Sequence, residues 1–384
     1  MRKLKIAIVA NSCWNIYNFR KDLIRHLKMA GHQVIVIAPV DEYIYYLTES
    51  YFTKHIPLNH LKSQGTSLIK DILVFKELFF IYKKEKPDLI LQYTIKPNIY
   101  GSIAAGVLGL KSVSNLTGLG FGFSKWYYRL IFSSLYKWAL FQNEKVVFHN
   151  SDDLKLFVNK KWVDANKAIV IPGSGVDANK FNAFPFKKDN NNFVFLFAGR
   201  LLKDKGLVEF VNAAIETRSI IKNVEFWVIG EYNASNPNSV SQKDLLQWIE
   251  SRVIKYFGHE HDVRKFMNKA DVLVLPSYRE GLSRSILEAM SMEKPIITSD
   301  VAGCRELVKH GWNGLLVSPK EVHQLAEAMV SIYNLSDEKR LQMGKNSRQL
   351  VLNKFDLNIV LHAYDELIEE LFSDEVFIPQ KFRS

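Results

Sequence analysis

Short apolar runs rich in β-branched residues alternate with longer segments of helical period through the first half of the chain. This alternation is typical of repeated strand–helix units and predicts a parallel sheet. A second series of the same kind starts near residue 193 and continues to residue 317. The predicted strands are 4–9, 34–37, 89–91, 146–148 and 169–171 in the first series, and 193–197, 224–229, 253–257, 272–275, 296–298 and 314–317 in the second.

The two series predict two doubly wound α/β domains in a chain of 384 residues. A turn-rich and then polar stretch at 173–192 separates them, so we expect domains at 1–175 and 190–355. Residues 356–384 form a third segment, whose apolar residues recur at three- and four-residue steps. Such a helix needs a surface to cover, and we expect it to return to the first domain. Two doubly wound domains facing across a cleft place their strand carboxyl ends, and hence their ligand sites, along that cleft.

Charge adds a partner class to this picture. The net charge is +11, and residues 1–180 hold 25 Lys or Arg against 13 Asp or Glu, so the basic excess belongs to the first half. Such a field attracts an anionic partner, either nucleic acid or an anionic membrane leaflet. Two distant cysteines, Cys13 and Cys304, disfavour a disulfide framework or a zinc site and fit a reducing compartment. The sequence shows no apolar run of the ~18 residues that a spanning helix needs.

The segment 271–289 combines a buried strand, a loop and a helix start with two carboxylates, Glu280 and Glu288. Gly281 allows close approach of backbone to a ligand, and the N–H groups around Leu282 and Ser283 at the helix start form an anion site. A phosphate fits there, with the two glutamates accepting from neighbouring hydroxyls. The alternative is ordinary acidic capping with a solvated Glu288.

The segment 197–206 ends a second buried strand with two cations, Arg200 and Lys205. An arginine binds two oxygens at once and a lysine adds a point charge, a pair that stabilises charge growing on a leaving phosphate. Taken alone, these residues are more typical of a solvated basic turn. Because they share strand ends with the acidic segment, a diphosphate site is favoured.

These residues resemble glycosyltransferase family 4, the retaining nucleotide-sugar enzymes with the glycosyltransferase B fold. The matching pieces are 198–201 with 205–206, the pair Glu280 and Glu288, 300–306 and 313–317. The resemblance implies that Arg200 and Lys205 hold the donor diphosphate, that Glu280 contacts the transferred sugar and that Glu288 holds the ribose. It also implies transfer without a bound metal, and the sequence contains no Asp-x-Asp pair. We therefore expect no cofactor.

The first domain departs from many relatives, which have a glycine pair after the first strand and a histidine after the fourth. Lys96, Asn98 and His149 are the candidate acceptor contacts, although a solvated lysine and a packed histidine are the plainer interpretations. His259 and His261 lack a recognisable third ligand, so no metal site is assigned.

The segment 124–141 has helical period and combines basic with aromatic side chains. Lys125, Trp126, Arg129 and Lys137 are its candidate membrane contacts. An amphipathic helix buried against the first sheet explains the pattern equally well.

The resemblance implies a bacterial enzyme on the inner face of the cytoplasmic membrane. It would move a hexose or N-acetylhexosamine from a UDP sugar to a polyprenyl-diphosphate-linked sugar in surface polysaccharide, O-antigen, capsule or glycoprotein glycan assembly. Loops 92–101 and 115–122 resemble those of bacterial N-acetylgalactosaminyltransferases. The alternatives are an epimerase or phosphorylase of the same fold, a glycoside hydrolase, or a basic nucleic-acid-binding protein. The last gives no role to the two glutamates, so we expect no nucleic acid partner.

Overall fold

A computed structural model describes residues 2–48, 53–61, 68–118, 126–184 and 192–373, with the side chains of 68, 69 and 126–133 left undescribed. The chain divides into two compact units. Unit 1 comprises Met1–Ser174 and Val360–Ser384, and unit 2 comprises Gly175–Ile359. The chain thus passes from one unit to the other at Gly175 and returns at Val360.

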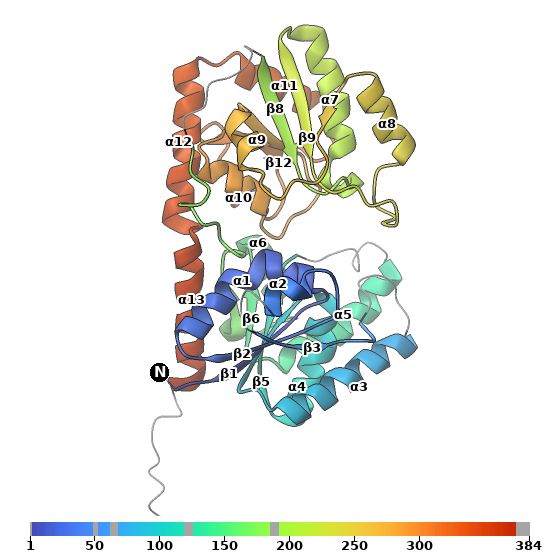
Figure 1. Cartoon of the computed structure of the whole chain (residues 1–384), viewed down its shortest axis with the longest axis vertical. Helices are drawn as coiled ribbons and strands as arrows, with labels where there is room; N and C mark the ends of the chain where they lie inside the picture. Colours follow the sequence, from blue (N-terminus) through green and yellow to red (C-terminus); the bar gives the residue numbers. More distant parts are fainter. Residues whose placement is uncertain (1, 49–52, 62–67, 119–125, 185–191, 374–384) are drawn as a thin grey trace, which may run out of the picture. The chain divides into compact units, whose positions relative to one another are not determined.

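Unit 1 contains a seven-stranded parallel sheet with the order β3-β2-β1-β4-β5-β6-β7 (Figure 1). The central strands pair in register, with Ile8 opposite both Val36 and Leu91. Because the order reverses beside β1, the carboxyl ends of β1 and β4 meet at a topological switch point, where doubly wound sheets bind ligands. The strands are β1 (Lys5–Val9), β2 (Gln33–Ala38), β3 (Lys54–Pro57), β4 (Leu89–Tyr93), β5 (Lys111–Leu116), β6 (Lys145–Phe148) and β7 (Ala168–Val170).

Helices cover this sheet because each presents one apolar stripe to it. In α1, Ile16, Leu23 and Leu27 are buried in the same core as the strands. The C-terminal helix α13 adds Val360 and Tyr364 to that core, so the prediction that the tail returns to the first domain is confirmed. The helices of unit 1 are α1 (Cys13–Met29), α2 (Ile44–Thr48), α3 (Leu68–Glu85), the π-helix η1 (Pro97–Gly101), α4 (Ser102–Leu108), α5 (Trp126–Phe141), α6 (Ser151–Asn159), η3 (Ala165–Lys167) and α13 (Leu357–Phe372).

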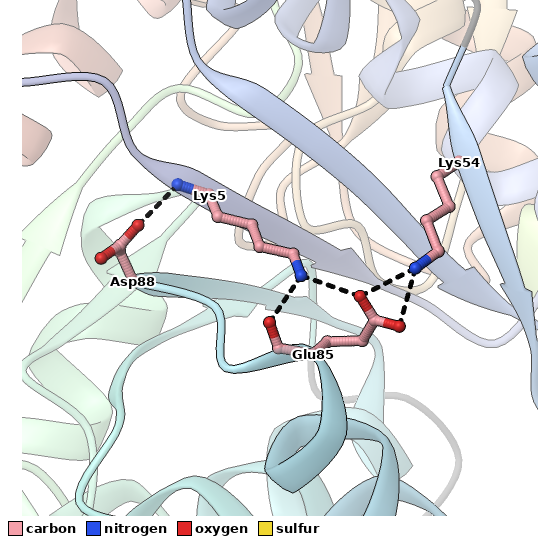
Figure 2. Close-up of polar contacts among 4 residues, drawn as sticks. All are labelled: Lys5, Lys54, Glu85 and Asp88. Carbon is pink, nitrogen blue, oxygen red and sulfur yellow. Dashed lines mark hydrogen bonds and ion pairs between the residues drawn. The ribbon is translucent and has the colours of Figure 1, made fainter.

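An ionic cluster joins the amino ends of β1 and β3 to the carboxyl end of α3 (Figure 2). Lys5 Nζ lies 2.8 Å from Glu85 Oε2, and Lys54 Nζ lies 2.8 Å from Glu85 Oε1. The Lys5 backbone N–H donates to Asp88 at 2.7 Å. Hydrogen bonds from the two lysines lower the pKa of Glu85. The cluster therefore fixes the end of α3 against β1 and β3, and its contribution to stability is lost as pH falls through the lowered pKa.

Unit 2 contains a six-stranded parallel sheet with the order β10-β9-β8-β11-β12-β13. Its two central strands lie side by side, with Phe195 of β8 opposite Val272 of β11. The strands are β8 (Phe193–Ala198), β9 (Val224–Ile229), β10 (Lys255–Tyr256), β11 (Val272–Leu275), β12 (Ile296–Ser299) and β13 (Gly314–Val317). The helices are η4 (Lys203–Lys205), α7 (Leu207–Ile220), α8 (Gln242–Glu250), α9 (Arg264–Lys269), α10 (Arg284–Ser291), α11 (Val322–Tyr333) and α12 (Asp337–Lys354).

The prediction of two doubly wound α/β units is confirmed, but two strands of unit 1 were missed. β3 is a short edge strand, and β5 is central yet polar in sequence. The serines of β5 are buried, and their hydroxyl groups form hydrogen bonds inside the unit. Ser112 Oγ donates to Asn143 Oδ1 at 2.9 Å, and Ser114 Oγ lies 3.0 Å from Ser102 Oγ. These hydrogen bonds offset the cost of burying polar side chains in β5. A search for hydrophobic patterns in the sequence does not detect such a strand.

Candidate active site

A short basic loop follows β8 at the carboxyl edge of the sheet in unit 2. Arg200 lies at its start with an exposed side chain that forms no hydrogen bond or ion pair with any described residue. The one-turn helix η4 then carries Lys205, whose side chain is only 20% exposed. The loop therefore presents two exposed cations, Arg200 and Lys203, and one largely buried cation, Lys205, at the same strand end.

Gly206 sets the position of this loop. Its backbone is left-handed, with φ +77°, and it joins η4 to the start of α7. A Cβ atom at this position would lie 2.1 Å from the Pro276 carbonyl oxygen. Glycine is required because the backbone after β8 passes in direct contact with the backbone after β11.

Hydrogen bonds fasten these two loops together. The Tyr278 N–H donates to the Asp204 carbonyl at 2.8 Å, and Ser277 Oγ donates to the same oxygen at 3.2 Å. Tyr278 Oη also donates to Glu209 of α7 at 2.5 Å. These bonds hold the loop that carries Lys205 against the loop that carries Glu280.

Lys205 and Glu280 form an ion pair between these two loops. Lys205 Nζ lies 2.6 Å from Glu280 Oε1, and the Glu280 side chain is 9% exposed. A buried pair of this kind costs desolvation that its mutual attraction offsets only in part. Its charges are therefore available to interact with a polar, charged ligand that enters the site.

The backbone at Gly303 also packs directly against the backbone at Glu280. A Cβ on Gly303, where φ is +80°, would lie 2.5 Å from the carbonyl oxygens of Glu280 and Gly281. The neighbouring Cys304 is fully buried. Burial, with the charge of Glu280, raises the pKa of this thiol to about 12, so it stays protonated at neutral pH and is not a nucleophile.

The start of α10 lies just beyond Glu280. Ser283 is its N-cap, yet among the described residues no side chain caps the first turn. Ser283 is buried, Gly281 is buried and Leu282 is half-buried against the core. Glu288, one turn into the helix, accepts from Arg284 Nε at 2.8 Å and keeps 12% of its side chain exposed. The geometry fits the predicted anion site with an adjoining carboxylate.

Asp204 belongs to this site and was missed from the sequence. Its Oδ1 is buried without a hydrogen-bond partner among the described residues. Burial raises the pKa of Asp204, while the charges of Lys205 and Arg200 oppose that rise. Its position between two lysines of the basic loop is the signal that could have indicated it.

The predicted acceptor residues all lie at the carboxyl edge of the sheet in unit 1, but they differ in surroundings. Lys96 Nζ is paired with Asp71 at 3.0 Å, and Asn98 is buried with its amide nitrogen donating to the Asn115 carbonyl at 2.9 Å. His149 follows β6 and is buried. Burial, with the charge of Arg20, lowers the pKa of His149 to about 3, so the ring is neutral at pH 7.

The predicted membrane contacts are only partly visible. Lys125 lies outside the described residues, and Trp126 and Arg129 lie in α5 with side chains outside them. Lys137 is exposed on the same helix, as are Trp138 and Phe141. No helix in the described ranges is long and apolar enough to cross a bilayer. Within those ranges, no three His, Cys, Asp or Glu side chains are grouped so that they could hold a metal ion, and this includes the surroundings of His259 and His261.

Family models match both units. A model for "Glycosyl transferase 4-like" sequences matches residues 5–150, and a model for "Glycosyl transferases group 1" matches residues 179–350. The second range contains Arg200, Lys205, Glu280 and Glu288.

Two relatives match over most of their lengths. The N,N'-diacetylbacillosaminyl-diphospho-undecaprenol alpha-1,3-N-acetylgalactosaminyltransferase of Campylobacter jejuni is 29% identical over 97% of this chain and 100% of its own. The UDP-Gal:alpha-D-GlcNAc-diphosphoundecaprenol alpha-1,3-galactosyltransferase of Escherichia coli is 31% identical over 82% of each chain. Among solved structures, that of Anabaena Alr3699/HepE in complex with UDP has a TM-score of 0.77 and 21% identity, over 96% of this chain and 100% of that one.

Two Rossmann-like units, with cations and carboxylates gathered at one strand edge of the second, define the glycosyltransferase B class of enzyme. The chain belongs to the glycosyltransferase family of the group 1 and 4-like models, and it is a glycosyltransferase. The family models and both relatives are glycosyltransferases, which favours sugar transfer over the hydrolase, epimerase and phosphorylase alternatives.

Proposed function

We propose that this enzyme transfers an N-acetylhexosamine from a UDP donor to a sugar carried on a polyprenyl diphosphate. The observation that carries the proposal is the buried Lys205–Glu280 pair beside the start of α10. The names of both relatives give an undecaprenyl-diphosphate-linked sugar as acceptor, which supports the proposed acceptor. The N-acetylhexosamine is supported by the name of the Campylobacter jejuni relative, and the UDP donor by the name of the Escherichia coli galactosyltransferase. The assembly of a bacterial surface glycan, such as a capsule, O-antigen or glycoprotein glycan, is the process that uses such a product.

Different residues of unit 2 bind different parts of the donor. Arg200 and Lys205 hold the diphosphate, the N–H groups around Leu282 and Ser283 bind its oxygens, and Glu288 accepts from the ribose hydroxyls. Glu280 accepts from a hydroxyl of the transferred sugar. Its charge, held by Lys205, also orients that lysine toward the diphosphate.

The chemical step breaks the bond between the anomeric carbon and the phosphate oxygen, and negative charge grows on the departing nucleoside diphosphate. Lys205 and Arg200 stabilise that charge, and the electrostatic gain is greatest in the transition state. The acceptor hydroxyl attacks from the same face of the sugar, and its proton passes to the departing phosphate oxygen. Anomeric configuration is retained, and the two cations take the part that a metal ion plays in other transferases.

A donor panel tests the substrates. Radiolabelled UDP-N-acetylgalactosamine, UDP-N-acetylglucosamine, UDP-galactose, UDP-glucose and GDP-mannose are each offered with polyprenyl-diphosphate-linked sugars, and label is counted in the lipid phase. We expect transfer from a UDP-N-acetylhexosamine. Because a charged loop replaces a metal, the rate should be unchanged when EDTA is added.

Two results would overturn parts of this proposal. Label that moves only from the GDP sugar, or only to a soluble acceptor, would contradict the substrate assignment while leaving the family assignment intact. Loss of transfer in EDTA, restored by manganese or magnesium, would contradict the metal-free mechanism.

We also propose that the enzyme works at a membrane surface, on the cytoplasmic face, because its proposed acceptor is lipid-linked. The basic first half, with the exposed Lys137, Trp138 and Phe141 of α5, is the proposed contact. Binding to vesicles containing phosphatidylglycerol should weaken as salt rises. A basic side chain near an anionic surface contributes about 1 kcal/mol, so Lys137→Glu should weaken binding at least about fivefold. Lys243→Glu, which reverses an exposed lysine of α8 in unit 2, is the matched control and should bind normally. Equal binding to neutral and anionic vesicles would refute the electrostatic contact.

A further inference from the structure

Unit 1 contains a buried arginine that the proposed mechanism does not use. Arg20 lies in the middle of α1, on the face turned toward the sheet, and is only 3% exposed. Its guanidinium carbon lies 4.0 Å from the centre of the Tyr93 ring, at the end of β4. The helix register thus places a permanent positive charge at the carboxyl edge of the sheet, beside the topological switch point.

This charge has no acidic partner among the described residues. No carboxylate within those ranges forms an ion pair with Arg20, and its Nε is buried without a hydrogen-bond acceptor. The ring beneath it gives a cation–π contact, which offsets only part of the desolvation cost of a buried guanidinium. An unpaired buried charge of this kind is a cost that a purely structural arginine would not impose.

The neighbouring polar groups do not neutralise Arg20 either. Tyr93 Oη donates to Tyr364 Oη at 3.1 Å, which in turn donates to Asn115 Oδ1 at 2.7 Å. Burial raises the pKa of both tyrosines, so they stay protonated. The hydrogen bonds between these side chains hold the ring under Arg20 in place and fix it to α13, but they supply no negative charge.

Two further polar atoms at this edge lack partners. His149 Nε2 is buried with no hydrogen-bond partner among the described residues, and the charge of Arg20 reaches this ring. Thr94 Oγ1, directly after Tyr93, is likewise buried and unpartnered. Thr94 also has φ +72°, a strained conformation for a β-branched residue. Strain and unpaired polar atoms together are typical of ligand sites rather than of a structural core.

We propose that Arg20, His149 and Thr94 form an anion-binding site in unit 1 for a phosphate or diphosphate group. Arg20 supplies the charge and a two-pronged donor, the neutral His149 ring donates through Nε2, and the Thr94 hydroxyl donates a third hydrogen bond. The lipid-linked acceptor carries such a diphosphate. That identification rests on the proposed function, whereas the anion site itself rests on the geometry of unit 1.

Inorganic pyrophosphate is the probe for the site, and the full chain carrying both Arg200→Ala and Lys205→Ala is the background, so that neither cation of the candidate donor site contributes. At constant ionic strength, pyrophosphate should raise the melting temperature of this protein. Arg20→Met should reduce pyrophosphate affinity roughly 10- to 100-fold, the scale of losing charge-assisted hydrogen bonds. Arg25→Met, which removes an exposed arginine of the same helix that is paired with Asp22, is the matched control and should keep the full response.

The ligand-free melting temperature separates a binding role from a structural one. Removing an uncompensated buried charge should leave the melting temperature of Arg20→Met unchanged or higher. A lower melting temperature with an unchanged pyrophosphate response would show that Arg20 only supports the fold. If Arg20→Met does not fold, the background protein with Arg200→Ala and Lys205→Ala still decides: no stabilisation by pyrophosphate there would overturn the site.

Kinetics identify the source of the anion. Arg20→Lys keeps the charge but loses the planar fork, so it should raise KM for the polyprenyl-diphosphate-linked acceptor about tenfold and leave KM for the nucleotide sugar unchanged. A rise confined to the donor KM would show that the acceptor diphosphate is not the ligand. If no transfer is found with any acceptor, the proposed function fails, and the pyrophosphate titration still tests the anion site.

Discussion

Replacing Arg200 or Lys205 by alanine should lower kcat roughly 10²- to 10³-fold, which is the usual effect of removing one stabiliser of charge that develops in the transition state. Arg200 gives the cleaner experiment. Its side chain is exposed and forms no ion pair with a described residue, so Arg200→Ala should leave the melting temperature unchanged. Lys203→Ala removes an exposed lysine of the same loop and is the matched control, with activity expected to be retained.

Lys205 needs a second variant because it also neutralises Glu280. Lys205→Ala leaves a buried carboxylate unpaired, which commonly costs about 3–5 kcal/mol of stability. The double variant Lys205→Ala with Glu280→Gln should recover most of that stability but none of the activity. Recovery of turnover together with stability would show that the lysine acts only through folding, and unchanged turnover in Arg200→Ala and Lys205→Ala would remove both from the site.

Gly206→Ala should destabilise unit 2 strongly and also abolish transfer. A left-handed backbone costs a residue with a Cβ about 1–2 kcal/mol, and the contact with the Pro276 carbonyl at 2.1 Å forces a displacement that costs about 1–3 kcal/mol more. The displacement separates the loop of Lys205 from the loop of Glu280, so the charges no longer lie together. Thermal or denaturant unfolding measures the first effect, and label transfer measures the second.

Gly311→Ala is a closely matched control for this prediction. Gly311 has the same φ of +77°, but a Cβ there meets no atom within 4 Å. It should therefore lose only the backbone term, about 1–2 kcal/mol, and keep its activity. Equal losses of stability in the two variants would show that the close approach to Pro276 is unimportant.

The fold was accessible from the sequence because its units are local. The spacing of hydrophobic residues identifies each strand and the helix that follows it. A repeated strand–helix pattern has few ways to fold other than a parallel sheet. The polar strand β5 was not predicted, because its burial depends on contacts that are not local in the sequence. Ser112 forms a hydrogen bond with Asn143, and Ser114 forms one with Ser102, and these contacts exist only after the unit has folded.

The site was accessible from the sequence in part. The loop with Arg200 and Lys205 and the segment with Glu280 and Glu288 were recognised because each joins a buried strand to a helix, where charged residues in a ligand site are expected. Asp204 was missed although it lies between two lysines of the basic loop. Lys96 and Asn98 were predicted as candidate acceptor contacts, and in the structure Lys96 is paired with Asp71 and Asn98 is buried. Their roles toward an acceptor stay predictions.

The sequence by itself determined two parallel sheets, the family and the loops that bear the charges. Only the tertiary structure decided which charges meet. Lys205 and Glu280 are 75 residues apart, and they pair because β8 and β11 are neighbours in the sheet, an order that hydrophobic period does not encode. Arg20 is one of several basic residues of α1, and its spacing from Ile16, Leu23 and Leu27 puts it on the apolar face of the helix, but the sequence does not show what covers it there. Packing against Tyr93 buries its charge without an acidic partner, because burial depends on what covers a side chain rather than on the side chain itself.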